Sequence, residues 1–161
     1  MNLYILRHAS AGTRRANPAV DVKRPLDKEG KQQCFLVGGF LSALNVQFDR
    51  VVSSPLKRAL QTASLVGTET GYDGKIEISD ALSPEASVGK FQDLVRSLMK
   101  YENVLVVGHN PNLTVFFGSL LAPGGRMSTR LPGTLHWLVD PRILRGYARA
   151  TKSSRPKTSR K

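Results

Sequence analysis

Residues 103–108 read NVLVVG, a continuous apolar run that ends directly before His109. Runs of this kind are typical of central strands in parallel sheets, which are buried on both faces. Four other β-rich runs are expected to form strands, with amphipathic stretches between them: Met1–Leu6, Phe48–Ser53, Lys75–Ile78 and Thr134–Asp140. This alternation predicts an α/β domain with a mainly parallel sheet.

Apolar side chains at helical spacing mark two of the predicted helices. The first is predicted over residues 27–45, with Asp27 as its N-cap and one apolar face made by Cys34, Val37, Leu41 and Leu44. Cys34 is therefore interpreted as a core residue rather than a reactive thiol. A later helix is indicated by the spacing of Val88, Phe91, Val95 and Leu98.

Two more helices are predicted to begin at a cap residue followed by proline, a pair that favours a helix N-terminus. Ser54–Pro55 precedes one apolar stripe, and Asn110–Pro111 precedes the other. The stripes consist of Leu56, Ala59, Leu60, Ala63 and Val66 in the first helix and of Leu113, Phe116, Phe117, Leu120 and Leu121 in the second. Each helix follows a strand directly, which places its N-terminus at the carboxyl edge of the sheet.

Length and composition exclude several classes of protein. A chain of 161 residues suits one domain, and 40% hydrophobic against 22% charged residues excludes an intrinsically disordered chain. No apolar run is long enough to span a membrane, and the first residues lack the pattern of a signal peptide. A single cysteine cannot form an internal disulfide. These features predict a cytoplasmic protein.

The net charge of +12 is concentrated at the end of the chain. Residues 142–161 contain eight basic residues and no acidic one, which leaves 16 basic and all 12 acidic residues in 1–141, a net charge of +4. We therefore expect a domain over residues 1–141 and a basic extension over 142–161, which begins with a short helix around Ile143–Ala150. Nucleic-acid or acidic-surface binding through this extension is a competing interpretation, but such tails are more often solvated.

Three predicted strands lead into residues that can bind an anion. Arg7 and His8 follow the first strand, Arg58 lies in the first turn of the helix after the second, and His109 follows NVLVVG. Because the carboxyl ends of parallel strands meet at one edge of the sheet, we expect these side chains to lie together. Helix N-termini at the same edge add unpaired N–H groups and positive dipole ends. The sequence therefore predicts an anion site, most naturally for phosphate.

The same residues carry a resemblance to a known family. Arg7-His8-Ala9 resembles the RHG signature of the histidine phosphatase (phosphoglycerate mutase-like) superfamily. Residues 53–63, SSPLKRALQTA, resemble its S-P-x-x-R-A-x-Q-T-A motif, and residues 107–111, VGHNP, resemble its V-x-H-N-P motif. The short chain without a capping insertion and the Arg24-Pro25-Leu26 segment are similar to the SixA-type phosphohistidine phosphatases.

The resemblance implies a fold and a mechanism. The fold would be a three-layer α/β/α sandwich of the phosphoglycerate mutase type, without a cap domain. His8 would attack phosphorus as a neutral imidazole and form a covalent phosphohistidine, while its other ring nitrogen donates to a backbone carbonyl. Arg7 and Arg58 would clamp the phosphoryl oxygens, and a protonated His109 would add a donor. No cofactor and no metal are expected.

One segment departs from the family pattern and bears on the substrate. Many members carry a glutamate general acid in an L-x-E segment, but here Leu82-Ser83-Pro84 puts proline at that place and Glu85 one position later. A histidine leaving group, with a pKa of about 6.5, needs less protonation than an alkoxide. This favours a metal-independent phosphatase for phosphohistidine on signalling or phosphotransfer proteins. The alternative is a phosphatase for a sugar or nucleotide phosphate with Glu85 as its general acid.

Four further residues have open roles. Arg24 is expected either to line the phosphate pocket or to be a solvated loop residue. Arg14 and Arg15 follow the Arg7-His8-Ala9 motif closely, which would allow contact with an acidic protein substrate. His136 alternates with apolar residues on the last strand and is interpreted as structural.

Overall fold

The computed structural model describes residues 1–121 and 134–138. In this part of the chain five strands form one sheet in the order β3-β2-β4-β1-β5, and every pairing is parallel. The strands are β1 (Asn2–Arg7), β2 (Arg50–Ser53), β3 (Glu77–Ile78), β4 (Asn103–Gly108) and β5 (Thr134–Leu138). The NVLVVG run is β4 and lies at the centre of the sheet, as predicted, because apolar side chains on both faces suit burial under two helix layers.

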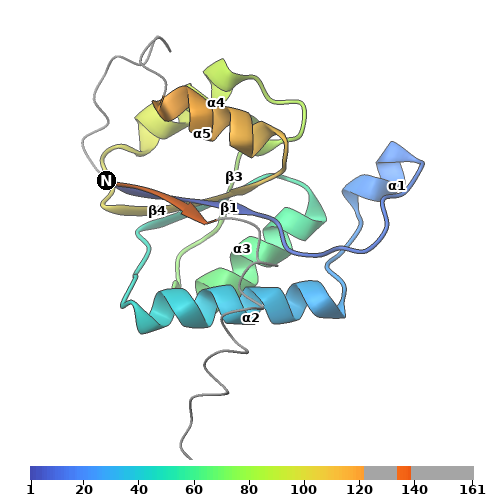
Figure 1. The fold of residues 1–161 in the computed structure, drawn as a ribbon, viewed down its shortest axis with the longest axis horizontal. Helices are drawn as coiled ribbons and strands as arrows, with labels where there is room; N and C mark the ends of the chain where they lie inside the picture. Colours follow the sequence, from blue (N-terminus) through green and yellow to red (C-terminus); the bar gives the residue numbers. More distant parts are fainter. Residues whose placement is uncertain (122–133, 139–161) are drawn as a thin grey trace, which may run out of the picture.

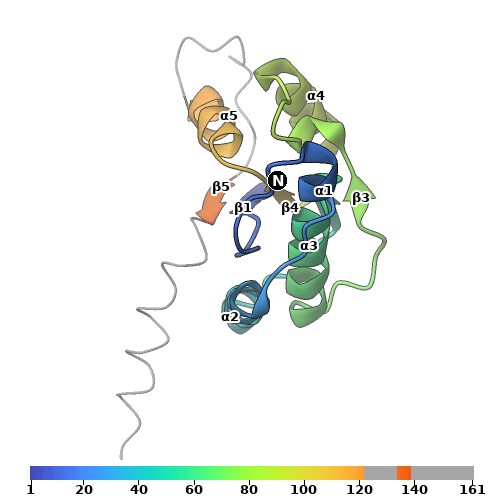
Figure 2. The same cartoon turned by 90° about the vertical axis from the view of Figure 1, so that its right-hand side faces the viewer.

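Helices cover both faces of the sheet, which confirms the α/β sandwich (Figures 1 and 2). The four long helices are α2 (Lys28–Ala43), α3 (Lys57–Glu69), α4 (Val88–Leu98) and α5 (Asn112–Leu121). Tyr4 and Leu6 of β1 pack in one core cluster with residues of α2 and α3, whereas Leu3 and Ile5 pack in a second cluster with residues of α4 and α5. This alternation follows from the period of two along a strand.

The start of α2 follows the sequence closely. Asp27 is its N-cap and accepts a hydrogen bond from the Gly30 N–H at 2.7 Å. Cys34, Val37 and Leu41 are buried in the first cluster, and burial raises the pKa of the Cys34 thiol to about 11, as expected of a core residue. Leu44 differs from the prediction: it is the C-cap of the helix and is 58% exposed.

The two proline pairs do not cap helices in the predicted way. Helix α3 begins at Lys57 with Leu56 as its N-cap, and α5 begins at Asn112. At the first pair, the Ser54 hydroxyl is hydrogen-bonded to His109 at 2.8 Å and accepts from the N–H of Leu56, the N-cap residue, at 3.4 Å, so it caps no residue within α3. The two prolines therefore lie in short connections between a strand and a helix.

Two elements were not predicted from the sequence. They are a five-residue helix, α1 (Pro18–Val22), and a short 3-10 helix, η1 (Asp80–Leu82). Figure 1 shows α1 beyond the carboxyl edge of the sheet, apart from both helix layers. The predicted extension over 142–161, its helix around Ile143–Ala150 and Asp140 lie outside the described residues. Within residues 1–121 and 134–138, no helix is long and apolar enough to cross a membrane.

Candidate active site

The register of the sheet brings the two site histidines together. Arg7, the last residue of β1, is paired with Gly108, the last residue of β4, so His8 and His109 leave the sheet side by side. The His8 N–H donates to the Gly108 carbonyl at 3.0 Å, and the two imidazole rings are 5.0 Å apart between centroids. The predicted convergence at the carboxyl edge thus follows directly from parallel pairing.

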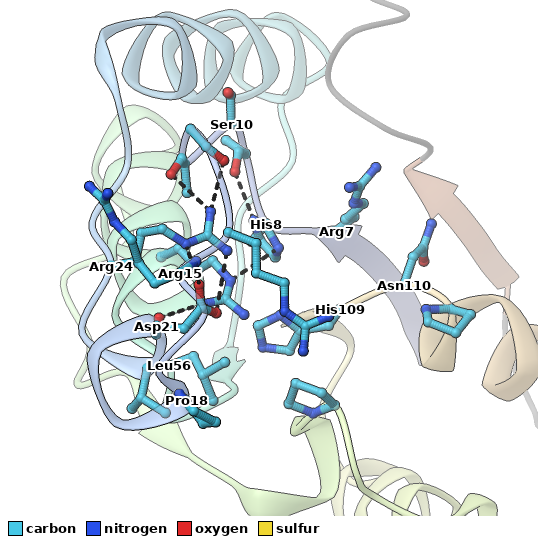
Figure 3. Close-up of a pocket in the computed structure, with 18 of the residues that line it drawn as sticks. Arg7, His8, Ser10, Arg15, Pro18, Asp21, Arg24, Leu56, His109 and Asn110 are labelled. Atoms are coloured by element: carbon cyan, nitrogen blue, oxygen red, sulfur yellow. Dashed lines mark hydrogen bonds and ion pairs between the residues drawn. The ribbon is translucent and has the colours of Figure 1, made fainter.

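A pocket of about 820 Å³ opens at this edge. All four predicted site residues line it: Arg7, His8, Arg58 and His109. Three further arginines, Arg14, Arg15 and Arg24, also line it, against only two acidic residues, Asp21 and Glu85. Figure 3 shows His8 and His109 in the middle, with Arg24 and Asp21 on one side and Arg7 on the other. This excess of guanidinium groups makes the pocket suitable for an anion.

His8 is held in the tautomer that a nucleophile requires. Its Nδ1 lies 2.8 Å from the Ala9 carbonyl oxygen, which can only accept, so the proton is on Nδ1. Nε2 keeps its lone pair and accepts from Nε of Arg58 at 3.3 Å. Burial, together with the charge of Arg58, lowers the pKa of His8 to about 4. The ring is therefore neutral at pH 7, with Nε2 available to attack an electrophile.

Arg58 is oriented by Asp21, a residue that the sequence analysis missed. Nη1 of Arg58 donates to the Asp21 carbonyl oxygen at 3.0 Å and to its carboxylate at 3.2 Å. Arg58 is only 6% exposed, and these bonds fix its guanidinium group so that Nε faces His8. Burial lowers the pKa of Arg58, and the Asp21 carboxylate opposes that shift.

Arg24 lines the pocket, but most of its donors are used within the protein. Its Nε donates to Asp21 at 2.8 Å, and its Nη1 donates to the carbonyls of Ala11 and Gly12 at 2.8 and 3.0 Å. The Arg24 bond is the main cause that lowers the pKa of Asp21 to about 2. Arg24 therefore braces the loop after His8 rather than standing as a solvated residue.

A sequence signal for Asp21 exists. Asp21 is the only acidic residue among the first 26, a stretch with four arginines, and Asn17–Pro18 begins its helix. Asn17 caps α1 by accepting from the Ala19 N–H at 3.0 Å. An isolated carboxylate among arginines indicates an ion pair, although the sequence alone does not say with which of them.

His109 differs in protonation from the expectation. Burial, with the neighbouring His8 and arginines, lowers its pKa to about 3, so it is neutral at pH 7 rather than protonated. Its Nε2 lies 2.8 Å from the Ser54 hydroxyl. If the Ser54 hydroxyl donates to Nε2, the proton of the neutral His109 ring is on Nδ1. Nδ1 is buried and has no described partner, so a phosphate oxygen would be a suitable acceptor.

The remaining motif residues hold the loop after His8 in place. The Thr62 hydroxyl accepts from the Ala9 N–H at 3.1 Å, and the Gln61 side chain accepts from the Leu26 N–H at 2.8 Å. Gly30 is required for space, because a Cβ there would lie 1.9 Å from the Ser10 carbonyl oxygen. The second motif thus supplies one phosphate-binding candidate, Arg58, together with two supports for the loop.

Glu85, the alternative general acid, lies at the rim of the pocket. It is exposed and lines the pocket together with Pro84. The Asn112 side chain donates to the backbone carbonyls of Ser83, Pro84 and Ala86, which ties this loop to the start of α5. No described residue forms a hydrogen bond or ion pair with the Glu85 carboxylate. Glu85 is therefore a candidate general acid, but no contact with a described residue fixes the position of its carboxylate.

The other predicted candidates are placed as follows. Arg14 and Arg15 are exposed and line the pocket. His136 belongs to β5, the strand predicted for it. Across the described ranges, no group of three or more histidine, cysteine, aspartate or glutamate side chains could hold a metal ion.

The depressed pKa of His109 predicts a pH-dependent stability. Between pH 8 and pH 5, His109 of the unfolded chain, with its ordinary pKa of 6.5, binds a proton. In the folded protein His109 remains unprotonated over this range. Acid therefore favours unfolding in this window, and His109 alone is expected to cost about 2 kcal/mol at pH 5. Asp21 contributes nothing here, because its stabilisation is lost only below its ordinary pKa of 3.8.

Denaturant unfolding at pH 8 and pH 5 checks this expectation. The His109→Asn variant should lose less free energy of unfolding between the two pH values than the wild type does, whatever its stability at pH 8. Equal losses in both proteins would contradict the depressed pKa.

Comparisons with known proteins agree with the geometry. Residues 3–105 match the family model of the histidine phosphatase superfamily (branch 1). The phosphohistidine phosphatase SixA of Escherichia coli strain K12 is 31% identical over 126 residues, which cover 77% of this chain and 76% of that protein. A solved structure of the protein histidine phosphatase SixA with tungstate superposes with a TM-score of 0.68 at 30% identity, covering 76% of this chain and 77% of the other.

A more distant structure shares the fold alone. The mycobacterial glucosyl-3-phosphoglycerate phosphatase in complex with VO3 gives a TM-score of 0.59 at 18% identity, covering 76% of this chain and 81% of that one. The family match includes Arg7, His8 and Arg58, and it ends before His109. From its matched residues, its fold and its SixA relative, the chain belongs to the histidine phosphatase superfamily.

Proposed function

We propose that this protein is a phosphatase that removes the phosphoryl group from phosphohistidine on a signalling or phosphotransfer protein. The observation that carries the proposal is the state of His8. It is a neutral imidazole whose Nε2 lone pair lies 3.3 Å from Arg58, in a pocket lined by five arginines. A nucleophile surrounded by fixed cationic donors suits attack on a phosphoryl group.

The proposed reaction has two steps. In the first, Nε2 of His8 bonds to phosphorus while the bond from phosphorus to the substrate imidazole breaks. The N–H of Arg58 that His8 now accepts would then be free to donate to a phosphoryl oxygen, together with Arg7 and Nδ1 of His109. A bound dianion would also raise the pKa of His109. In the second step, water attacks phosphorus, which releases inorganic phosphate and restores His8.

The leaving group of phosphohistidine differs from that of a phosphoester in its need for a general acid. A phosphohistidine ring that carries a proton on its other nitrogen leaves as neutral imidazole and needs little help from an acid. Pro84 occupies the place of the expected acid, and the Glu85 carboxylate has no described partner to aim it. The SixA relative, named a phosphohistidine phosphatase, supports the same substrate class.

The test is phosphate release from a histidine-phosphorylated phosphotransfer protein, compared with a panel of sugar and nucleotide phosphates. The assay contains EDTA, because the proposed chemistry uses only side chains of this chain. We expect kcat/KM for the phosphoprotein to exceed that for every ester by at least about 100-fold. A preference for one of the esters would overturn the proposal.

A second candidate is a phosphatase for a small phosphoester with Glu85 as general acid. Its supporting observation is that the Glu85 carboxylate lines the pocket and is not held elsewhere by a described residue. The Glu85→Gln variant separates the two functions. On phosphohistidine its kcat should stay within about threefold of the wild type, whereas an acid-dependent ester activity should fall by about 100-fold.

The matched control for this substitution is Glu77→Gln, an exposed glutamate on β3 at the edge of the sheet. It should leave both activities unchanged. A loss of phosphohistidine activity in Glu85→Gln alone would show that Glu85 acts on this substrate as well.

A further inference from the structure

Residues 12–25, which we call the arm, project from the domain at the mouth of the pocket. They include α1, which Figure 1 shows apart from the helix layers. Every arm residue except Asp21 and Arg24 is exposed, and the buried Asp21 forms ion pairs with Arg24 and Arg58. The arm therefore adds nothing to either core cluster, and its surface is available to a partner.

The exposed charge of the arm is entirely positive. Arg14, Arg15 and Lys23 are exposed and form no ion pair with any described residue. The single acidic residue, Asp21, is buried and is neutralised by Arg24 and Arg58. The arm therefore places a positive field beside the pocket, which attracts and orients an acidic surface.

The arm also exposes apolar side chains. Val20 is 52% exposed and Val22 is 45% exposed, and both belong to α1. Apolar side chains beside unpaired cations are typical of a protein interface with a small apolar centre and a polar rim. Val22 lines the pocket, but Val20 lies outside its lining. A small phosphoester bound in the pocket would gain nothing from Val20, so this part of the surface favours a protein partner.

We propose that the arm docks the acidic, partly apolar protein surface that surrounds the phosphorylated histidine of the substrate. The inference rests on the proposed function and adds the means by which a protein substrate is chosen over a small one. The arm and the pocket share an anchor, since Asp21 holds α1 to Arg58. A protein bound to the arm therefore lies within reach of His8.

Two arm variants that lie outside the pocket lining test the proposal: Lys23→Glu and Val20→Ser. The controls are Lys75→Glu and Leu44→Ser. Both control residues are exposed, Lys75 before β3 and Leu44 after α2, at the opposite edge of the sheet. Phosphate release is measured with two substrates, an acidic histidine-phosphorylated phosphotransfer domain and free phosphohistidine.

We expect Lys23→Glu to lower kcat/KM for the phosphoprotein about tenfold and to reduce its dependence on salt. Val20→Ser should lower it about threefold. For free phosphohistidine, kcat/KM of both variants should stay within about twofold of the wild-type value. The two control variants should stay within the same range for both substrates.

The outcomes separate the inference from the function. Unchanged turnover of the phosphoprotein by both arm variants, or equal losses on the two substrates, would overturn the docking role and leave the proposed function in place. Failure of the wild type to hydrolyse either substrate would overturn the function and the docking role together.

Discussion

The His8→Ala variant should lose phosphatase activity by a factor of at least about 1,000, while its fold is retained. In the proposed mechanism the other site residues bind and orient the phosphoryl group, and His8 is the side chain that forms a bond to phosphorus. Its Nδ1 is fixed to the Ala9 carbonyl, and its Nε2 faces Arg58. Removing the nucleophile removes the covalent step rather than slowing it.

The covalent step can be tested directly by trapping. Wild-type protein mixed with radiolabelled phosphoprotein and quenched in alkali should carry label, because phosphohistidine survives base and is cleaved by acid. Trypsin cuts after Arg7 and Arg14, so label on His8 appears in the peptide 8–14, whereas label on His109 appears in the peptide 101–126. Label in the second peptide, or activity retained by His8→Ala, would reject His8 as the nucleophile.

The backbone of the site could be predicted from the sequence because regular structure sets it. An apolar run such as NVLVVG has few alternatives to a central strand, and it forms β4 with the predicted bounds. Once β1 and β4 are parallel neighbours, His8 and His109 must emerge together at the carboxyl edge. Arg58 follows by the same reasoning from β2, which pairs with β4 on its other side.

The rest of the site depends on contacts that no local pattern encodes. Asp21 is 37 positions from Arg58, and a five-residue helix is too short to show an apolar period. Local cap preferences favour a helix start at Ser54–Pro55, but α3 begins at Lys57, and the Ser54 hydroxyl is hydrogen-bonded to His109, a residue 55 positions away. The neutral state of His109 arises from burial among nearby cations, which only the folded chain creates.

The second large effect is expected at Arg58. Replacing it with lysine keeps the positive charge that Asp21 needs, so the fold and the ion pair should persist. Lysine, however, lacks the rigid fork that bonds Asp21 and His8 at the same time. We therefore expect kcat/KM for a histidine-phosphorylated protein to fall about 100-fold in Arg58→Lys, because the oxygens of the transferred phosphoryl group lose an oriented hydrogen-bond donor.

Asp21→Asn should give a smaller loss with a different signature. Asparagine keeps an acceptor for the Arg15 N–H but removes the charge that holds Arg58, so the guanidinium is less well oriented. We expect kcat to fall about tenfold, whereas inhibition by inorganic phosphate stays the same or strengthens, since phosphate no longer competes with a carboxylate for Arg58.

The matched control for Arg58→Lys is Arg96→Lys. Arg96 is an exposed arginine on α4 that is paired with Asp93, and its replacement should change neither kcat nor the inhibition by inorganic phosphate. If Asp21→Asn matched the loss in Arg58→Lys and also weakened phosphate inhibition, Asp21 would be needed to build the pocket. Its role would then not be limited to orienting one side chain within it.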